Sequence, residues 1–289
     1  MSAIDFILLP KKKSLGSNFF VRRSLPDTRK QMVGPFIFWD HIGPYVIQDG
    51  YEIQVRAHPH IGLSTMTYLF SGQLVHRDSL GNVQVIKAGQ INWMTAGRGI
   101  SHSERTEPFE GMNTMEGIQM WVALPDEDED CAPSFLHKGL KAIPTMDIDS
   151  ITYSILLGSY QQTNGAVKGY SPMFCLSAKP TKGHRAQLWT NEEHESALYV
   201  FSGAVTIDGK VIEQGQMAVM KPGQSIEYSC LEDSNIMYFG GKPFPQKKQI
   251  WWNFVSSSTQ KIERAKQRWA NHEFESVVDE DERIPLPEK

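Results

Sequence analysis

The chain contains little cysteine and no long apolar run. Among its 289 residues only Cys131, Cys175 and Cys230 are cysteines, and no two of them have C-x-x-C spacing. An odd, scattered set argues against a disulfide framework and fits a reducing compartment. No segment approaches the ~20 apolar residues that span a bilayer. Residues 1–16 carry their charges after the apolar stretch rather than before it, unlike a signal peptide. We therefore expect a cytoplasmic protein without a membrane partner.

The chain also lacks a surplus of positive charge. It has 29 Lys and Arg against 33 Asp and Glu, which gives a formal net charge of -4. Neutralising phosphates requires an excess of basic residues, so direct nucleic-acid binding is not expected. Hydrophobic residues make up 40% of the chain and charged residues 21%, which allows a buried core in each of two ordinary domains.

What the sequence does contain is many short β-type runs. They occupy residues 64–70, 73–77, 84–87, 90–94 and 117–124, and turn signals such as Leu80-Gly81-Asn82 separate them. Asp208-Gly209 is typical of a two-residue hairpin turn of the primed type. Many strands at this spacing predict an all-β fold of sandwiches or barrels. Only residues 258–271 have helical spacing, with serines at 256–258 offering an N-cap.

The second half of the chain repeats the first. Thr67–Gly72 corresponds to Leu198–Gly203, and Lys87–Gly97 corresponds to Glu213–Gly223, in the same order and at nearly the same separation. This pattern indicates internal duplication of one barrel unit. An acidic, Pro-flanked stretch at residues 125–130 is expected to open the connection between the halves. We predict an N-terminal barrel at 1–132, a C-terminal barrel at 133–250, and a helix with a tail at 251–289.

Two pairs of residues in the first half carry the chemistry. His58 and His60 are two residues apart, and so are His102 and Glu104 after a Gly-rich turn. In a strand, residues i and i+2 point to the same face. If both strands face the barrel interior, three imidazoles and one carboxylate converge on one metal ion. The bland alternative is a pair of surface or hydrogen-bonded histidines.

The donor set limits the identity of the metal. Three nitrogens and one oxygen suit Fe(II), Mn, Ni, Co or Cu better than Mg or Ca, which prefer oxygen ligands. Structural zinc sites more often use cysteine ligands, although zinc remains one of the possible metals. Four protein ligands on a six-coordinate ion leave two positions for a substrate oxygen and O₂. Iron is the first choice.

Longer motifs around these residues resemble one family. The segments HPHIGLSTMTYLFSG (58–72) and GQINWMTAGRGISHSER (89–105) are similar to the pirin branch of the cupin superfamily. The similarity continues through residues 34–44, 117–125, 250–258 and 284–288. A general cupin has a glutamate four or five residues after the second histidine, where this chain has Ser64 and Thr65. Glu104 supplies the carboxylate, as in pirins.

The resemblance implies a fold, a cofactor and an activity. It implies two tandem cupin barrels (a bicupin) with a short C-terminal helix, and one metal, usually iron, in the N-terminal barrel. The implied ligands are His58, His60, His102 and Glu104. Several pirin-like proteins act on flavonols as quercetin 2,3-dioxygenases, and mammalian members are described as nuclear transcriptional coregulators. The implied partners are a flavonol and O₂, or a protein.

The duplication bears on the second barrel. Shifting the first-half ligands by the offset of the Ser-Gly turn places Trp189 and Asn191 opposite His58 and His60. Shifting by the offset of the Gly-Gln strand places Tyr228 and Cys230 opposite His102 and Glu104. No four-ligand set survives, so this barrel is expected to be metal-free and structural.

The sequence leads to a quercetin 2,3-dioxygenase-like mechanism and two rivals. A flavonol would bind the open metal positions, with Glu104 accepting its hydroxyl proton. Ring opening with loss of carbon monoxide is implied by the resemblance. One rival is a non-enzymatic, iron-dependent regulator that binds a protein partner, and the other is a dioxygenase with a different substrate.

The remaining candidates are weaker. Four residues in the matching motifs could line a substrate pocket or simply pack in the core: Phe38, Trp93, Met94 and Gln119. His41 beside Asp40 could support a metal ligand from outside. His76 and His137 have no partner at ligand spacing, so hydrogen-bonded or exposed roles are expected for them.

Overall fold

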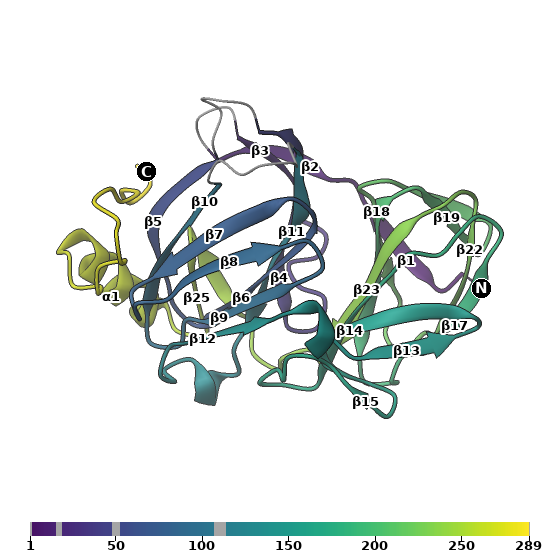
Figure 1. Cartoon of the computed structure of the whole chain (residues 1–289). Coiled ribbons are helices and arrows are strands. Elements are labelled where there is room, and N and C mark those ends of the chain that lie inside the picture. The colour runs from purple at the N-terminus through teal and green to yellow at the C-terminus, as the bar shows by residue number, and fades with distance from the viewer. Residues whose placement is uncertain (1, 16–18, 48–52, 107–113, 289) are drawn as a thin grey trace. The chain divides into compact units, whose positions relative to one another are not determined.

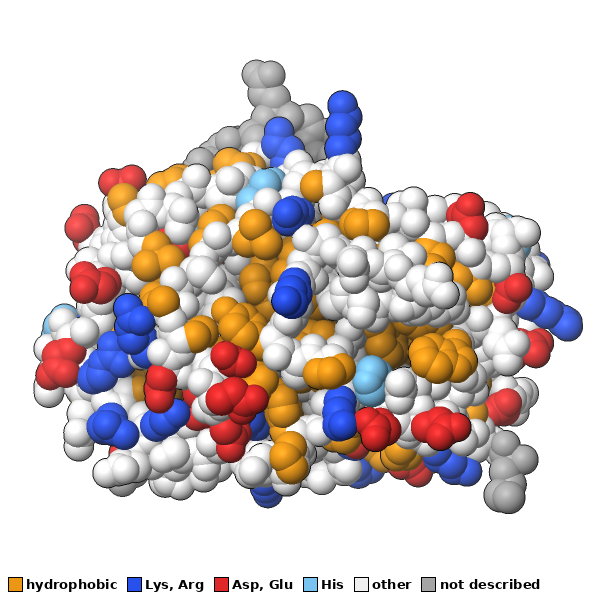
Figure 2. Space-filling view, turned by 90° about the horizontal axis from the view of Figure 1, so that it is seen from below, with side chains coloured by type: hydrophobic (Ala, Val, Ile, Leu, Met, Phe, Trp, Pro, Cys, Tyr) orange, Lys and Arg blue, Asp and Glu red, His pale blue; other side chains and the backbone are white. Residues whose placement is uncertain are grey.

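The computed structural model describes residues 2–15, 19–47, 53–106 and 114–288 (Figure 1). Nearly all of its regular structure is β-strand, with one α-helix, α1 (Thr259–Ala270), near the C-terminus. Two tandem β-barrels and a short C-terminal helix are therefore present, as predicted. No helix in the described part of the chain is long and apolar enough to cross a membrane. On the face drawn in Figure 2, basic and acidic side chains are interspersed.

The chain forms two compact units that interleave along the sequence. One comprises Met1–Lys12, Arg22–His41 and Leu140–Phe244, and is called the C-barrel here. The other comprises Lys13–Val21, Ile42–Gly139 and Pro245–Lys289, and is called the N-barrel. These units are not consecutive segments, because the first strand of the chain pairs within the C-barrel. The domain boundaries at 132/133 and 250/251 stay a prediction.

The N-barrel places four strands in one sheet, in the order β5-β10-β7-β8. A second sheet has the order β12-β9-β6-β11 and continues through the strands β4, β3 and β2, which carry the chain between the units. The bounds are β2 (Lys11–Ser14), β3 (Phe20–Leu25), β4 (Phe36–Val46), β5 (Gln54–His60), β6 (Leu63–Ser71), β7 (Gln73–Asp78), β8 (Val83–Lys87), β9 (Ile91–Thr95), β10 (Ile100–Arg105), β11 (Thr114–Ala123) and β12 (Ser134–Lys138).

The C-barrel repeats this arrangement. Its sheets have the orders β17-β22-β19-β20 and β1-β21-β18-β23-β16-β14-β13. The bounds are β1 (Ile4–Leu8), β13 (Thr145–Ile148), β14 (Ile151–Tyr160), β15 (Thr163–Asn164), β16 (Met173–Ala178), β17 (Arg185–Leu188), β18 (Glu195–Ser202), β19 (Ala204–Ile207), β20 (Lys210–Glu213), β21 (Met217–Met220), β22 (Ile226–Cys230) and β23 (Asn235–Gly241). The matching sheet orders agree with the duplication read from the sequence.

Local sequence explains the turns and the connection. Asp208 and Gly209 both have positive φ, 50° and 75°, as a primed hairpin turn requires. The acidic stretch forms a single 3-10 turn, η1 (Asp126–Asp128), and a second one, η2 (Leu140–Ala142), follows β12. Neither contains a buried residue, which fits the polar composition of the connection.

The helix and a small hairpin close one side of the N-barrel. The hairpin consists of β24 (Gln249–Trp251) and β25 (Phe254–Ser256). Ser258 caps α1 by accepting a hydrogen bond from the Lys261 N–H, and the helix buries Ile262, Ala265 and Trp269. A Cβ on Gly62 would lie 2.0 Å from the Val255 carbonyl oxygen, so only glycine lets β25 come this close. The hairpin is thereby held beside the end of β5.

Candidate metal centre

Two neighbouring strands bring the three predicted histidines together. β5 and β10 are antiparallel, with His58 opposite His102 and His60 opposite Ile100. One ligand nitrogen from each of His58, His60 and His102 lies within 4.8 Å of the other two. The three side chains are 7%, 1% and 1% exposed. The i, i+2 rule therefore predicted this convergence from the sequence alone.

The spacing of the nitrogens suits a transition-metal ion. His60 Nε2 and His102 Nε2 are 3.0 Å apart. Two nitrogens each about 2.1 Å from one ion, at a right angle, are separated by roughly 3.0 Å. The His58 ring lies beside them, with its centroid 4.3 Å from that of His102, and one of its nitrogens is within 4.8 Å of a nitrogen of each of the other two. The residues present thus fit a small divalent metal.

Hydrogen bonds determine which nitrogen of each ring is free. His58 Nδ1 donates to the Arg56 carbonyl oxygen at 2.8 Å, and His60 Nδ1 donates to the Asn253 carbonyl oxygen at 3.2 Å. A carbonyl oxygen can only accept, so Nδ1 must carry the proton in both rings. The Nε2 lone pairs then remain for a ligand, which is the usual way that outer partners orient metal-binding histidines.

Burial also keeps these imidazoles neutral. Burial, with a smaller contribution from nearby His76, lowers the pKa of His58 to about 4, although the bond to the Arg56 carbonyl acts in the opposite direction. Burial, together with the neighbouring histidines, holds the pKa values of His60 and His102 well below the usual 6.5. At pH 7 all three rings are therefore in the neutral form that binds metals.

Glu104 lies in β10, the strand of His102, and a β-bulge separates the two residues. Thr67 Oγ1 donates to Glu104 Oε1 at 3.3 Å and lies 2.7 Å from Gln119 Oε1. Burial raises the pKa of Glu104, although Thr67 and Gln119 act in the opposite direction. A nearby cation would stabilise the charged form of this buried carboxylate. The carboxylate is not in the group of ligand atoms within 4.8 Å, which contains the three histidines.

The other pocket candidates divide between two faces. Gln119 contacts Thr67, and Met94 is opposite Thr65 in the β6–β9 register, on the same face as Thr67. Trp93 is opposite Met66 and therefore points to the other face of the sheet, away from Glu104. Phe38 belongs to the C-barrel, where the Arg23 guanidinium lies 4.1 Å from its ring centroid.

Sequence reasoning missed several neighbours of the histidines. The Trp121 ring packs edge-on against His60, with centroids 5.1 Å apart. Its position two residues after Gln119 in β11 was the available signal. The carbonyl of Asn253 comes from the β24–β25 hairpin, far along the chain, and no sequence signal marks it.

His41, the other histidine considered for a role near the metal, contacts a residue of the C-barrel. Its Nδ1 atom lies 2.8 Å from the Tyr199 hydroxyl.

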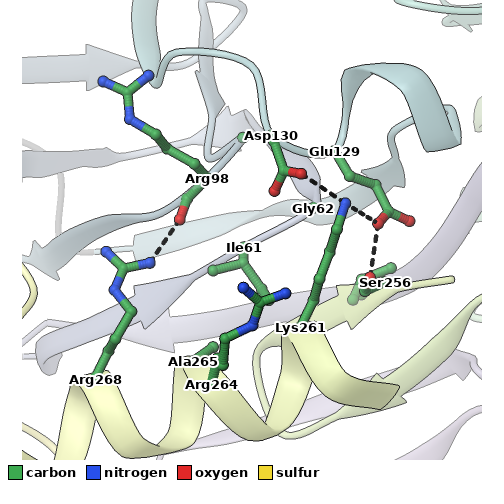
Figure 3. Close-up of a pocket in the computed structure, with 12 residues that line it drawn as sticks. Ile61, Gly62, Arg98, Glu129, Asp130, Ser256, Lys261, Arg264, Ala265 and Arg268 are labelled. Carbon is green, nitrogen blue, oxygen red and sulfur yellow. Dashed lines mark hydrogen bonds and ion pairs between the residues drawn. The ribbon is translucent and has the colours of Figure 1, made fainter. Parts of the chain in front are cut away.

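A cavity of about 380 Å³ adjoins the centre but does not contain it (Figure 3). It lies between α1 and the ends of the barrel strands, and Ile61, directly after His60, is part of its wall. Lys261 pairs there with Glu129 and Asp130, while Arg268 donates to the Arg98 carbonyl oxygen. The three histidines are absent from its lining, so this cavity is not the substrate site expected over a metal.

Comparisons with known proteins agree with this geometry. The family model described as Pirin matches residues 18–122, and that of the Pirin C-terminal cupin domain matches residues 176–275. A pirin-like protein of Caulobacter vibrioides is 43% identical over 99% of this chain and 100% of its own length. The two barrels are thus cupin domains.

Solved structures give the same result. A quercetin 2,3-dioxygenase from Acinetobacter baumannii is 30% identical, with a TM-score of 0.91, covering 98% of this chain and 95% of its own. A bacterial pirin from Escherichia coli, solved in complex with nickel(II), has a TM-score of 0.66 at 19% identity, covering 83% and 99% of the two chains. At that identity the likeness shows the fold.

Proposed function

Because the chain belongs to the pirin family of the cupin superfamily, we propose that it is a metal-dependent dioxygenase acting on a small aromatic substrate. The proposed substrate class is a flavonol such as quercetin, with O₂ as the second substrate. Its similarity to an Acinetobacter baumannii quercetin 2,3-dioxygenase over nearly the whole chain supports this choice. We further propose a cytoplasmic location, in keeping with the scarcity of cysteine.

One observation carries the proposal: three buried imidazoles each place a ligand nitrogen within 4.8 Å of the other two, and hydrogen bonds leave Nε2 of His58 and His60 without a proton. We propose His58, His60, His102 and Glu104 as the metal ligands. Three nitrogens and one carboxylate oxygen favour a first-row transition metal, and Fe(II) is our first choice. Mn, Ni, Co, Cu and Zn are the alternatives that elemental analysis would distinguish, and nickel is the ion named for the Escherichia coli pirin.

The side chains around the ligands have separable tasks in this proposal. The metal, when bound, would supply a Lewis acid with open positions for substrate oxygen atoms and O₂. Glu104 accepts the proton of the flavonol 3-hydroxyl on a carboxylate oxygen, because its raised pKa makes it a stronger base than an exposed glutamate. Thr67 and Gln119 hold that carboxylate, while Met94 and Trp121 provide apolar walls that exclude water.

Anaerobic mixing of iron-loaded protein with quercetin, followed by air, tests the proposal. We expect bleaching of the flavonol only after air is admitted, with one O₂ consumed and one CO released for each flavonol. His60→Ala should abolish the bleaching, whereas His184→Ala in the C-barrel should retain it. Stoichiometric metal without turnover of any flavonol would contradict the enzyme and favour the metal-dependent regulator.

A further inference from the structure

His102 differs from the other two histidines in what holds its ring. The Nδ1 atoms of His58 and His60 bond backbone carbonyls. His102 Nδ1 instead lies 3.4 Å from His76 Nδ1, at the long end of hydrogen-bond distance. His76 is on β7, the strand next to β10, and its second nitrogen, Nε2, is 3.1 Å from Asp78 Oδ2. A chain of contacts therefore runs from a carboxylate to a proposed metal ligand.

Asp78 can act only as an acceptor in this chain of contacts. The side chain is fully buried, and its Oδ1 accepts hydrogen bonds from the Leu80 N–H and from both the backbone and side-chain N–H groups of Asn82. Burial alone would raise the pKa of Asp78, but the hydrogen bonds from His76 and Asn82 outweigh it and lower the pKa. The carboxylate is thus ionised, and the nitrogen facing it must carry a proton.

The proton on His76 Nε2 fixes the rest of that ring. A neutral imidazole with a proton on Nε2 has a lone pair on Nδ1. The ring cannot easily turn, because it stacks on Phe135 with centroids 4.4 Å apart and planes at 13°, and it is 4% exposed. His76 Nδ1 therefore offers His102 an acceptor, which favours a proton on His102 Nδ1 and a lone pair on His102 Nε2.

We propose that Asp78 and His76 form a positioning pair that selects the metal-binding tautomer of His102. The opposite tautomer would donate its Nε2 proton to His60 Nε2, 3.0 Å away, and occupy the point where a metal would lie, so the pair acts against that hydrogen bond. The pair does not touch that point, so its effect passes through His102. This proposal rests on the metal site of the proposed function, but not on the identity of the substrate.

The variant Asp78→Asn reverses the direction of the contacts with little change in shape. The amide oxygen of the variant can keep the bonds that Oδ1 accepts from Leu80 and Asn82. Its NH₂ group, in the place of Oδ2, faces His76 Nε2 and gives up the 2.9 Å bond that Oδ2 accepts from Asn82 Nδ2. His76 Nε2 would then accept, its Nδ1 would donate to His102 Nδ1, and the His102 proton would move to Nε2. Wrong-tautomer effects of this kind are known where an aspartate orients a catalytic histidine.

Nitrogen NMR of histidine-labelled, metal-free protein at pH 8 reads the tautomer directly. We expect a larger fraction of His102 protonated on Nδ1 in the wild type than in Asp78→Asn, in which the population should shift towards the Nε2 proton that bonds His60. Zinc, a diamagnetic probe, should bind the variant about 10–100-fold more weakly, as is typical when an outer partner of a metal ligand is lost. A purely structural role for Asp78 would not move the proton.

Two further variants separate orientation from packing. His76→Phe keeps the stack on Phe135 and removes the acceptor, so zinc affinity should fall, whereas His76→Gln retains an acceptor and should recover part of it. His137→Phe is the control, because His137 Nδ1 bonds the Asn92 side chain rather than His76 or a proposed metal ligand. All variants are compared by their unfolding midpoints in urea.

Each outcome has a distinct meaning. An unchanged His102 tautomer in Asp78→Asn, together with zinc affinity within twofold of wild type, would overturn the positioning role. Wild-type protein that binds no zinc, nickel or iron would overturn the proposed function instead. The NMR comparison of metal-free proteins would still decide whether Asp78 sets the tautomer.

Discussion

The two barrels share a sheet order and differ in what fills the same place. In the N-barrel, β10 pairs with β5 and His102 is opposite His58. In the C-barrel the corresponding strands are β22 and β17, and Tyr228 is opposite Ala186. Tyr228 bonds Tyr153 within a core of aliphatic and aromatic side chains. A hydrogen-bonded pair of tyrosines thus fills in the C-barrel the place that histidines fill in the N-barrel, which supports the proposal that these histidines serve a metal rather than the fold.

The strand register also corrects one sequence expectation. Ile226 is opposite Leu188, as Ile100 is opposite His60, so Ala186 and Leu188 correspond to His58 and His60. The offset from the Ser-Gly turn had indicated Trp189 and Asn191. That offset was wrong here because residues 189–194 separate β17 from β18, whereas only residues 61–62 separate β5 from β6. Within the described residues, the C-barrel still contributes no group of metal-binding side chains.

Among the variants that distinguish the two barrels, His60→Ala in the N-barrel should have the largest effect. Loss of a direct ligand is expected to weaken metal binding by more than the ~10–100-fold typical of an outer partner, and to remove dioxygenase activity. The metal-free variant should also unfold at a lower urea concentration than metal-free wild type, with a stability lower by about 1–3 kcal/mol, because the Asn253 carbonyl loses its donor. Metal binding by chelator competition and urea titration check the two halves of this prediction. Wild-type metal affinity in the variant would contradict the ligand assignment.

Leu188 is the C-barrel residue that corresponds to His60, so Leu188→Ala is the matching change in that barrel. Leu188 is fully buried, so its truncation should lower the free energy of unfolding by about 2–5 kcal/mol through lost burial and a residual cavity. Metal content should stay at the wild-type level. Urea unfolding and metal analysis test this prediction. A loss of metal larger than the loss of folded protein would contradict the expectation that only the N-barrel binds the metal.

Acid should act on a buried ion pair of the N-barrel. Burial alone would raise the pKa of Glu129, but hydrogen bonds from Lys248, Ser256 and the Ser257 N–H lower it below 4.5. Because the folded-state pKa is lowered, the stabilisation is present above about pH 4.5 and is lost as the pH falls further. Glu129→Gln should cost about 2–3 kcal/mol at pH 7, since Lys248 is fully buried and loses one of the two carboxylates that it pairs with, Glu129 and Asp126.

Urea titrations between pH 7 and 3.5 measure this difference. The gap between wild type and Glu129→Gln should shrink below about pH 4.5. The matched control in the C-barrel is Glu193→Gln, since Glu193 forms an exposed pair with Lys242 and no measurable change is expected. A gap that is constant with pH would show that Glu129 acts through packing rather than charge.

The smallest expected effect is that of Tyr228→Phe. It removes the hydroxyl that bonds the Tyr153 hydroxyl inside the C-barrel and leaves that partner buried. The free energy of unfolding should fall by about 1 kcal/mol, with metal content unchanged. A destabilisation near that of Leu188→Ala would mean that polar contacts, and not apolar packing, dominate this core.

Local patterns were enough to predict much of this molecule. The strand runs, the primed turn at Asp208-Gly209 and the helix after Ser258 all depend on neighbouring residues, and the structure has them. The convergence of His58, His60 and His102 also followed from the alternation of side chains along strands. The expected hydrogen-bonded role for His76 is confirmed by its contact with Asp78.

Features that depend on distant pairing were not predictable. The Asn253 carbonyl reaches His60 from a hairpin 193 positions later. The contact of His76 with His102 requires β7 to lie beside β10, which no local pattern specifies. Trp93 was grouped with Met94 because both are in one motif, although adjacent residues of a strand face opposite sides.

The pairing of β1 with β21 also constrains how the protein is made. Ile4 is opposite Met220, and the Ala3 N–H donates to Asp208. β1 must therefore wait for β21, which is made more than two hundred residues later, roughly 10–40 s at ordinary rates of synthesis. During that time β1 cannot form its pairing with β21. Slow or interrupted synthesis would lengthen the time for which β1 is unpaired and open to non-native contacts.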